Sequence, residues 1–207
     1  MESKENLLLS LGQSGIKPSY LEEFLNTNTG LTNPYHNLQH ALRVAESTVR
    51  ASHFMKLDTE TQTSLALAGL FHDWGHPGKM GNDHANVTRA AEKVHSIADG
   101  DLVVIRAAYM IMGTEFPLPQ GFALTPEQDI LRDADYWHCA LLSESDWLAL
   151  QIGLAKEMGK SPAEWFAGNL EFVKTVPGLS PWGKYMASEY REVLIRRVVM
   201  WADRLAE

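Results

Sequence analysis

Apolar residues along this chain recur with the spacing of helices and not with that of strands. A stripe at helical spacing predicts a helix over 37–54, and it consists of Leu38, Ala41, Leu42, Ala45 and Val49. Valine and isoleucine nowhere alternate with polar residues over a convincing strand length. The pattern therefore predicts an all-α fold.

A second run, Ser64–Phe71, is apolar nearly all round, which predicts a central and buried helix. Thr59 followed by Gln62 resembles a capping box that opens this helix, and Pro77-Gly78 breaks it. The remaining helices are predicted over 84–98, 101–112, 126–142, 144–157, 162–174 and 184–205.

Two of these helices have a recognisable start. Thr125-Pro126 and Ser161-Pro162 each combine an N-cap residue with proline at the first helical position. Segments 116–121 and 177–181 are rich in proline and glycine and are predicted to be loops within compact helical regions. No repeat or low-complexity linker divides the chain, so we expect a single domain over 1–207.

The composition, 45% hydrophobic and 21% charged over 207 residues, is typical of a globular protein. A formal net charge of −8 argues against nucleic acid as a partner, since phosphate backbones bind basic surfaces. A small phosphorylated substrate is still compatible with this charge, because bound metal ions supply local positive charge. The oligomeric state is not readable from these numbers.

The cellular location follows from three absences in the sequence. The single cysteine, Cys139, cannot form an internal disulfide, which fits a reducing compartment. No run reaches the roughly 18 apolar residues that a membrane-spanning helix requires. Met1-Glu-Ser-Lys-Glu-Asn leads into a short Leu-rich piece without the cleavage site of a signal peptide. We therefore expect a cytoplasmic protein with no membrane partner.

Candidate chemistry is concentrated in two short stretches, Pro34-Tyr-His-Asn-Leu-Gln-His-Ala41 and Phe71-His-Asp-Trp-Gly-His-Pro-Gly78, which hold half of the eight histidines. Imidazole nitrogen and carboxylate oxygen both bind divalent metals. His36 and His40 would share one side of a helix, opposite the apolar stripe, if both belonged to it. Surface histidines are the alternative interpretation of that pair alone.

Two aspartates extend this candidate metal site. Asp73 ends a strongly apolar helix, where a buried carboxylate needs a cation or several hydrogen-bond donors. Asp135 lies in another apolar helix and is the further ligand that we favour. The alternative is that Asp133 or Asp135 pairs with Arg132 or caps a neighbouring helix.

In order along the chain, His40, His72-Asp73 and Asp135 resemble the metal ligands of the HD superfamily of metal-dependent phosphohydrolases. Tyr35-His-Asn-Leu-Gln-His-Ala41 and His72-Asp-Trp-Gly-His-Pro-Gly78 are similar to the signature of class I cyclic-nucleotide phosphodiesterases. The resemblance covers about 34–137, and helices over 144–205 would complete the HD-type fold.

The resemblance implies that His40, His72, Asp73 and Asp135 hold a first metal ion, either Zn, Fe or Mn. Asp73 would bridge to a second ion, Mg or Mn, held mainly through waters. The shell of that second ion would consist of His76, Glu92, His95 and Thr114. A hydroxide between two such ions is a nucleophile at neutral pH. His36 would act as the general acid that protonates the departing ribose oxygen, and Asn37 would orient it.

Some positions depart from the phosphodiesterase pattern. Gly75 and Glu115 stand where aspartate is usual, and the purine-clamping glutamine has no clear equivalent. Asn169 with Phe172 has the clamp's spacing, although Phe172 in the core and Asn169 on the surface is the simpler interpretation. Trp74 would either stack a base or pack. The candidate substrate-binding residues are Tyr35, Asn37, Trp74, Asn169 and Phe172.

The expected function is hydrolysis of a 3′,5′-cyclic nucleotide to the 5′-monophosphate with two divalent metal ions. One alternative is an HD-domain phosphohydrolase that acts on another nucleotide, an alarmone or another phosphoester. Another is a binding module of this fold without catalysis. His53, His84 and His138 match no ligand position, and we expect them to be structural.

Overall fold

Every regular element that the structure describes is helical. The computed structural model describes residues 11–12, 14–79 and 81–206, and no strand occurs among them. The α-helices are α2 (Pro18–Thr27), α3 (Leu38–Met55), α4 (Thr59–Phe71), α5 (Asp83–Ser96), α6 (Leu102–Ile111), α7 (Pro126–Trp137), α8 (Glu144–Glu157), α9 (Pro162–Thr175) and α10 (Pro181–Ala206). Two 3₁₀ turns, η1 (Met112–Thr114) and η2 (His138–Leu141), follow α6 and α7. The predicted all-α fold is confirmed.

Most predicted helix starts are correct, and one is wrong. Thr125 and Ser161 each form a capping box, with proline in the first turn of the helix. The predicted box of Thr59 and Gln62 does not form. Asp58 is the N-cap of α4 instead, because its carboxylate accepts the backbone N–H of Thr61. Asp58 thus provides the N-cap that the sequence pattern had placed at Thr59, one residue later.

The sequence pattern also missed one helix and misplaced two boundaries. It predicted no helix over Pro18–Thr27, where α2 begins at a proline that is tolerated in the first helical turn. The predicted helix 126–142 ends its α-helical part at Trp137, and η2 continues it. The last helix begins at Pro181, three residues before the predicted start. The Leu-rich piece near the N-terminus lies outside the described residues.

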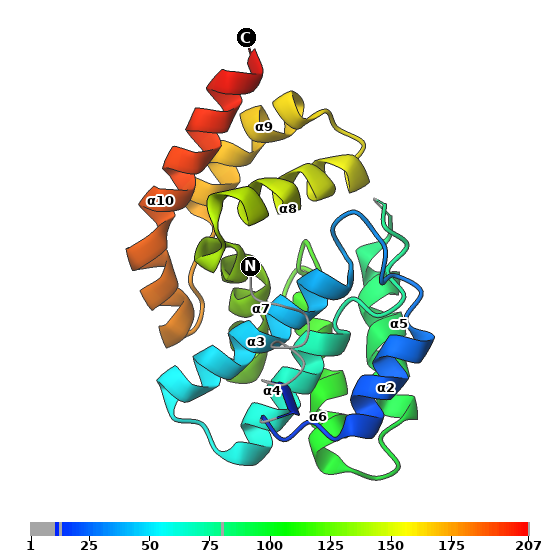
Figure 1. Ribbon diagram of the computed structural model, residues 1–207. Helices are drawn as coiled ribbons and strands as arrows, with labels where there is room; N and C mark the ends of the chain where they lie inside the picture. The colour runs from blue at the N-terminus through cyan, green and yellow to red at the C-terminus, as the bar shows by residue number, and fades with distance from the viewer. Residues whose placement is uncertain (1–10, 13, 80, 207) are drawn as a thin grey trace.

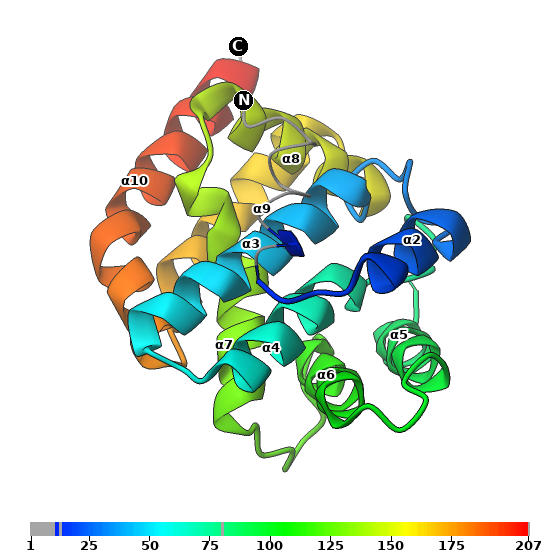
Figure 2. The same cartoon turned by 60° about the horizontal axis from the view of Figure 1, so that its bottom comes forward.

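The middle of the molecule is the packed pair α3 and α4. Figure 2 shows these helices side by side, with α6 next to α4 and α5 next to α6. A Cβ on Gly69 of α4 would lie 2.8 Å from the Cα of Ala45 on α3, so glycine permits the close approach. As predicted, α4 is buried on nearly all sides. The approach brings the N-terminal half of α3 near the C-terminal end of α4.

Helices α8, α9 and α10 gather at one end of the molecule, and α2, α5 and α6 lie toward the other (Figure 1). The carboxylate of Asp133 on α7 fixes the start of α10, because it accepts the backbone N–H groups of Leu179 and Ser180. Gly183 packs directly on that carboxylate, where a Cβ would overlap it. None of the helices in the described part of the chain has the length and apolar character needed to span a bilayer.

Candidate metal centre

Four side chains from three helices converge where α3, α4 and α7 meet. His40 lies in the first turn of α3, whose start is fixed by Asn37, the N-cap that accepts the His40 backbone N–H. His72 is the C-cap of α4, and Asp73 follows it in a turn. Asp135 projects from α7 toward both histidines. These are the four residues predicted to hold a first metal ion.

The separations between their ligand atoms fit a common ion. His72 Nε2 lies 2.8 Å from Asp73 Oδ2 and 3.6 Å from Asp135 Oδ1. His40 Nε2 lies 3.1 Å from Asp73 Oδ2, 3.2 Å from His72 Nε2 and 3.3 Å from Asp135 Oδ1. Metal bonds of about 2.0–2.2 Å, at octahedral to tetrahedral angles, place neighbouring donors about 2.8–3.6 Å apart. These five distances fall in that range, and His40 is shared by two potential ligand groups, one with His72 and Asp73 and the other with Asp135 and His138.

The hydrogen bonding at the cluster also fits a metal. His72 donates its Nδ1–H to the carbonyl of Gly69, so the Nε2 of the neutral ring presents a lone pair to the cluster. Asp73 Oδ2 is buried without a hydrogen-bond partner, although imidazole nitrogens surround it. A cation that replaces the ring protons would satisfy these converging lone pairs together. The donor set of two imidazoles and two carboxylates therefore fits a divalent ion.

The imidazoles of the cluster keep its two carboxylates ionised. Burial opposes ionisation of Asp73, but the nearby His72 and His36 outweigh it and hold the Asp73 pKa well below its usual value. Burial likewise opposes the charge on Asp135, and hydrogen bonds from His40 and His72 lower its pKa. For His72, burial opposes protonation, yet Asp73 and Asp135 raise the pKa well above its usual value. Both carboxylates are thus ionised at neutral pH.

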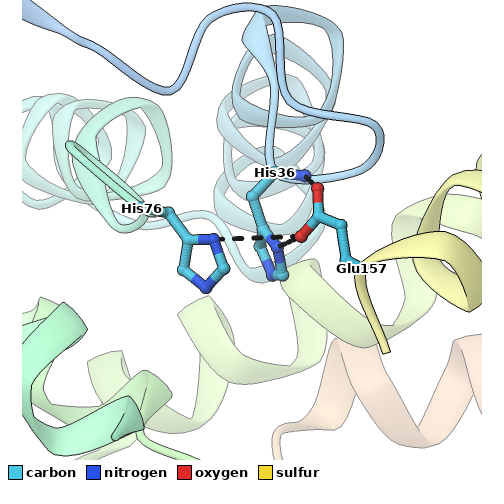
Figure 3. A group of neighbouring side chains, drawn as sticks. All are labelled: His36, His76 and Glu157. Atoms are coloured by element: carbon cyan, nitrogen blue, oxygen red, sulfur yellow. Dashed lines mark hydrogen bonds and ion pairs between the residues drawn. The ribbon is translucent and has the colours of Figure 1, made fainter. Parts of the chain in front are cut away.

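A second group consists of His36, His76 and Glu157 (Figure 3), and its His36 lies 4.0 Å from Asp73 of the first cluster. His36 belongs to the loop before α3 and not to a helix, which corrects the expectation that it might share a helical face with His40. Glu157 ends α8 and accepts the backbone N–H groups of Tyr35 and His36 at 2.6 and 3.0 Å. Its other oxygen lies 2.5 Å from His36 Nδ1. Glu157 therefore holds both the backbone and the ring of His36.

In this second group, His36 and Glu157 form a hydrogen-bond network, and His76 packs against it. Both Glu157 oxygens already accept hydrogen bonds, and His76 Nδ1 accepts the N–H of Gly78. The rings of His36 and His76 pack together with their centroids 3.7 Å apart and their planes tilted by 35°. Burial and the charge of His36 lower the His76 pKa to about 4, so His76 is neutral near pH 7. Ligand atoms that are already satisfied make a metal here less favourable than at the first cluster.

His36 is set up to carry a proton toward the metal cluster. Burial opposes its charge, but Asp73 and Glu157 together raise its pKa above the usual value. Because Nδ1–H donates to Glu157, the second N–H of the imidazolium is on Nε2. That nitrogen lies 4.0 Å from Asp73 Oδ2. The ring therefore points its free N–H at the candidate metal centre.

The residues expected around a second metal ion are dispersed. His76 lies in the network described above, and Thr114 is buried with its hydroxyl donating to the Ile111 carbonyl. Glu92 and His95 are exposed on α5, and neither has a hydrogen bond or ion pair to the cluster within the described part of the chain. The second metal shell stays a prediction that these positions do not support.

The predicted substrate-binding residues have varied surroundings. Asn37 uses its amide for backbone carbonyls and the N-cap, and Tyr35 packs its ring on His40 with the centroids 4.5 Å apart. The indole N–H of Trp74 donates to Thr27 of α2. Asn169 is buried and donates to Gln151, which contradicts its expected surface position. Phe172 is 40% exposed, so it does not lie in the core as expected.

Phe172 belongs to a partly exposed aromatic group with Tyr136 and Phe116. Its ring contacts Tyr136, the residue after Asp135, with the centroids 5.8 Å apart, and both rings contact the exposed Phe116. Arg132 donates to the carbonyls of Gly113 and Glu115 and covers two of these rings. Arg132 therefore does not pair with Asp133 or Asp135. The capping alternative holds for Asp133, and Asp135 joins the metal cluster.

Sequence reasoning missed two functional candidates, Glu157 and His138. Glu157 follows a stretch without any motif, and its role depends on α8 folding back against the loop before α3. Gly153 permits this contact, because a Cβ there would overlap the carbonyl of Pro34. His138 is buried, contacts His40 with ring centroids 5.0 Å apart, and belongs to a further potential ligand group with His40 and Asp135. The sequence feature that could have indicated His138 is its position three residues after Asp135.

The fold and the site together define a helical protein with histidine and aspartate clusters that could bind metal, which is compatible with an HD-type fold. No protein-family model matches the chain, and no match is found among curated proteins. Functional conclusions therefore depend on the geometry of the site and on the motifs in the sequence.

Proposed function

We propose that this protein is an HD-type, metal-dependent phosphoester hydrolase, with a 3′,5′-cyclic nucleotide as its leading substrate. The observation that supports the proposal most is the convergence of His40, His72, Asp73 and Asp135 at metal-ligand spacing. A second observation is the adjoining His36, whose free nitrogen faces that cluster. Metal ligands beside a positioned proton donor suit cleavage of an ester whose leaving oxygen needs a proton.

In this proposal the four ligands hold a divalent ion, which, when bound, supplies positive charge for the phosphoryl oxygens and an activated water. His36 gives its Nε2 proton to the leaving oxygen. Glu157 keeps His36 charged and fixes its orientation, since it binds the ring and the backbone of the same residue. His76 packs against the ring without competing for the proton, because it is neutral near pH 7.

One observation favours the second candidate, an HD-type phosphohydrolase that acts on another nucleotide, an alarmone or another phosphoester. The side-chain amide of Asn169 is buried and donates to Gln151, so it is not poised to read a purine edge. The partly exposed rings of Phe116 and Phe172 still offer an apolar surface near Asp135. Such a surface stacks a base without specifying which base.

A substrate screen tests the proposal. The protein loaded with Mn²⁺ or Mg²⁺ is incubated with cAMP, cGMP, nucleoside monophosphates and a guanosine tetraphosphate-type alarmone, and product formation is followed by chromatography. We expect conversion of a cyclic nucleotide to the 5′-monophosphate, and loss of that activity in His72→Ala. Turnover of a different phosphoester alone would support the second candidate. Activity unchanged in His72→Ala would refute both.

The role of His36 is tested by changing the leaving group. His36→Asn should lower the turnover of a cyclic nucleotide by about 10²–10⁴-fold, the usual contribution of a general acid. It should spare a p-nitrophenyl phosphodiester, whose leaving group departs without a proton. His53→Asn, an exposed histidine on the same helix as His40, is the matched control and should leave both reactions unchanged. Equal losses on both substrates would exclude His36 as the acid.

A further inference from the structure

His138 packs against His40, and one of its ring nitrogens lies within 4.8 Å of ligand atoms of both His40 and Asp135. It begins η2, directly after the helix that carries Asp135, and it is only 3% exposed. The two imidazole rings meet edge to face, with their centroids 5.0 Å apart and an interplanar angle of 66°. His138 is therefore a direct neighbour of a candidate metal ligand.

The hydrogen bonds of His138 fix which of its nitrogens carries the proton. Its Nδ1 lies 2.7 Å from the backbone carbonyl of Asp135, and a carbonyl can only accept, so Nδ1 is protonated. In a neutral imidazole with its proton on Nδ1, the other ring nitrogen carries a lone pair. The Nε2 of His138 is then a lone-pair acceptor. It is buried and has no hydrogen-bond partner.

His40 presents the complementary group. Its Nε2 faces His72, Asp73 and Asp135, so as a metal ligand this nitrogen uses its lone pair and the proton is on Nδ1. That Nδ1 is also buried without a partner. Two adjacent rings thus hold one unpaired donor and one unpaired acceptor. A metal-binding histidine almost always donates its other ring N–H to such an acceptor.

Other partners for His138 are available nearby. A cavity of about 210 Å³ adjoins His138 and is lined also by Gln39 and Ser47, whose Nε2 and Oγ lack hydrogen-bond partners. A bond from either of them to His138 would satisfy its Nε2 but would leave the His40 donor unpaired. Pairing the two rings satisfies both at once. The pairing also requires no ordered water in the cavity.

We propose that His138 is a positioning residue of the metal centre, whose Nε2 accepts the Nδ1 proton of His40 and so directs the His40 Nε2 lone pair at the metal ion. The inference rests on the metal centre of the proposed function. A chain of hydrogen bonds then runs from the Asp135 carbonyl through His138 to His40. The residue that supplies one ligand thereby also orients another.

Metal affinity tests this role without any measurement of catalysis. The metal-free protein is titrated with Zn²⁺ against a competing chelator, for the wild type, His138→Leu, His138→Gln and the control His53→Leu. We expect about 10–100-fold weaker binding in His138→Leu, the usual cost of losing such a partner. His138→Gln, which can place an acceptor near the Nε2 position, should recover most of the affinity. His53→Leu should bind as the wild type does.

The proposal can be refuted by this titration or, if the variant does not fold, by a second measurement. Affinity in His138→Leu within twofold of the wild type, in a variant whose circular dichroism shows that it is folded, would overturn the proposal. If His138→Leu does not fold, long-range ¹H–¹⁵N spectra of the Zn²⁺-loaded wild type decide. They should show His40 protonated on Nδ1 and His138 unprotonated on Nε2, whereas a protonated His138 Nε2 would refute the pairing. A weakened metal site in a protein without phosphoesterase activity would refute the proposed function alone.

Discussion

Asp133 and Asp135 are two positions apart on α7, and their carboxylates serve opposite sides of that helix. Asp133 accepts the backbone N–H groups of Leu179 and Ser180 and the Ser180 hydroxyl, and so it anchors the start of α10. Asp135 faces His40 and His72. Two helical positions correspond to a rotation of about 200°, so one short sequence supplies an anchor and a ligand.

This division predicts separable effects of the two amide substitutions. Asp133→Asn should lower the free energy of unfolding by about 2–3 kcal/mol, because a buried acceptor of several hydrogen bonds loses its charge. It should leave the metal affinity of the folded protein nearly unchanged. Asp135→Asn should weaken metal binding by more than about 100-fold, since losing a ligand costs more than losing an outer partner. Urea unfolding and metal titration of both variants measure these effects. A loss of metal affinity in Asp133→Asn with a loss of stability alone in Asp135→Asn would contradict the prediction.

The close contact of α8 with the loop before α3 predicts that Gly153 cannot be enlarged freely. A Cβ at this position would overlap the Pro34 carbonyl. Gly153→Ala should therefore destabilise the protein by about 1–3 kcal/mol and displace Glu157, one helical turn further on, from His36. Thermal unfolding and activity measurements would record both effects.

Gly168 on α9 provides the matched control, because a Cβ there would meet nothing within 4 Å. Gly168→Ala should raise the stability by up to about 1 kcal/mol through helix propensity alone. Similar effects of the two substitutions would show that the contact at Gly153 has no special role.

The pair of His36 and Glu157 predicts the direction of a pH effect. Asp73 and Glu157 raise the pKa of His36 against the opposing effect of burial. A general acid is active when protonated, so turnover is present below this raised pKa and is lost as the pH rises through it. Glu157→Gln removes one of the negative charges that raise this pKa, so the descending limb of the pH–rate profile should move to lower pH. An unmoved limb, or one moved to higher pH, would show that another group sets it.

Metal binding should also stabilise the fold. An ion that binds only the folded state raises the free energy of unfolding, by about 2.7 kcal/mol when its concentration is 100 times the dissociation constant. The melting temperature of the metal-free protein should therefore rise with added Mn²⁺ or Zn²⁺, whereas that of His72→Ala should not. An equal rise in both proteins would place the stabilising ion elsewhere.

The parts of the structure that local sequence determines were predicted well. The N-caps at Thr125 and Ser161 and the buried character of α4 depend on neighbouring residues, so short patterns indicate them. His40 and His72 belong to histidine motifs at the start of α3 and the end of α4, and these motifs indicated a common site. Asp135 was favoured over Asp133 from its place in an apolar helix, the family's order of ligands agreed, and the geometry then separated the two residues.

The parts that were missed depend on contacts between distant segments. Glu157 acts on a loop about 120 positions earlier, which no local pattern indicates. The role of His138 is inferred from two ring nitrogens without hydrogen-bond partners, one on His138 and one on His40, and only the three-dimensional structure shows them. The helix α2 was missed because a proline near its start was not used as a first-turn signal.

The central claim is that His40, His72, Asp73 and Asp135 share one metal ion, and anomalous diffraction tests it most directly. Crystals of the protein grown with Zn²⁺ or Mn²⁺ are measured on both sides of the absorption edge of the metal. The account predicts an anomalous peak about 2.0–2.2 Å from His40 Nε2, His72 Nε2, Asp73 Oδ2 and Asp135 Oδ1. A peak confined to His36, His76 and Glu157 would contradict the account, and so would the absence of a peak at the four proposed ligands.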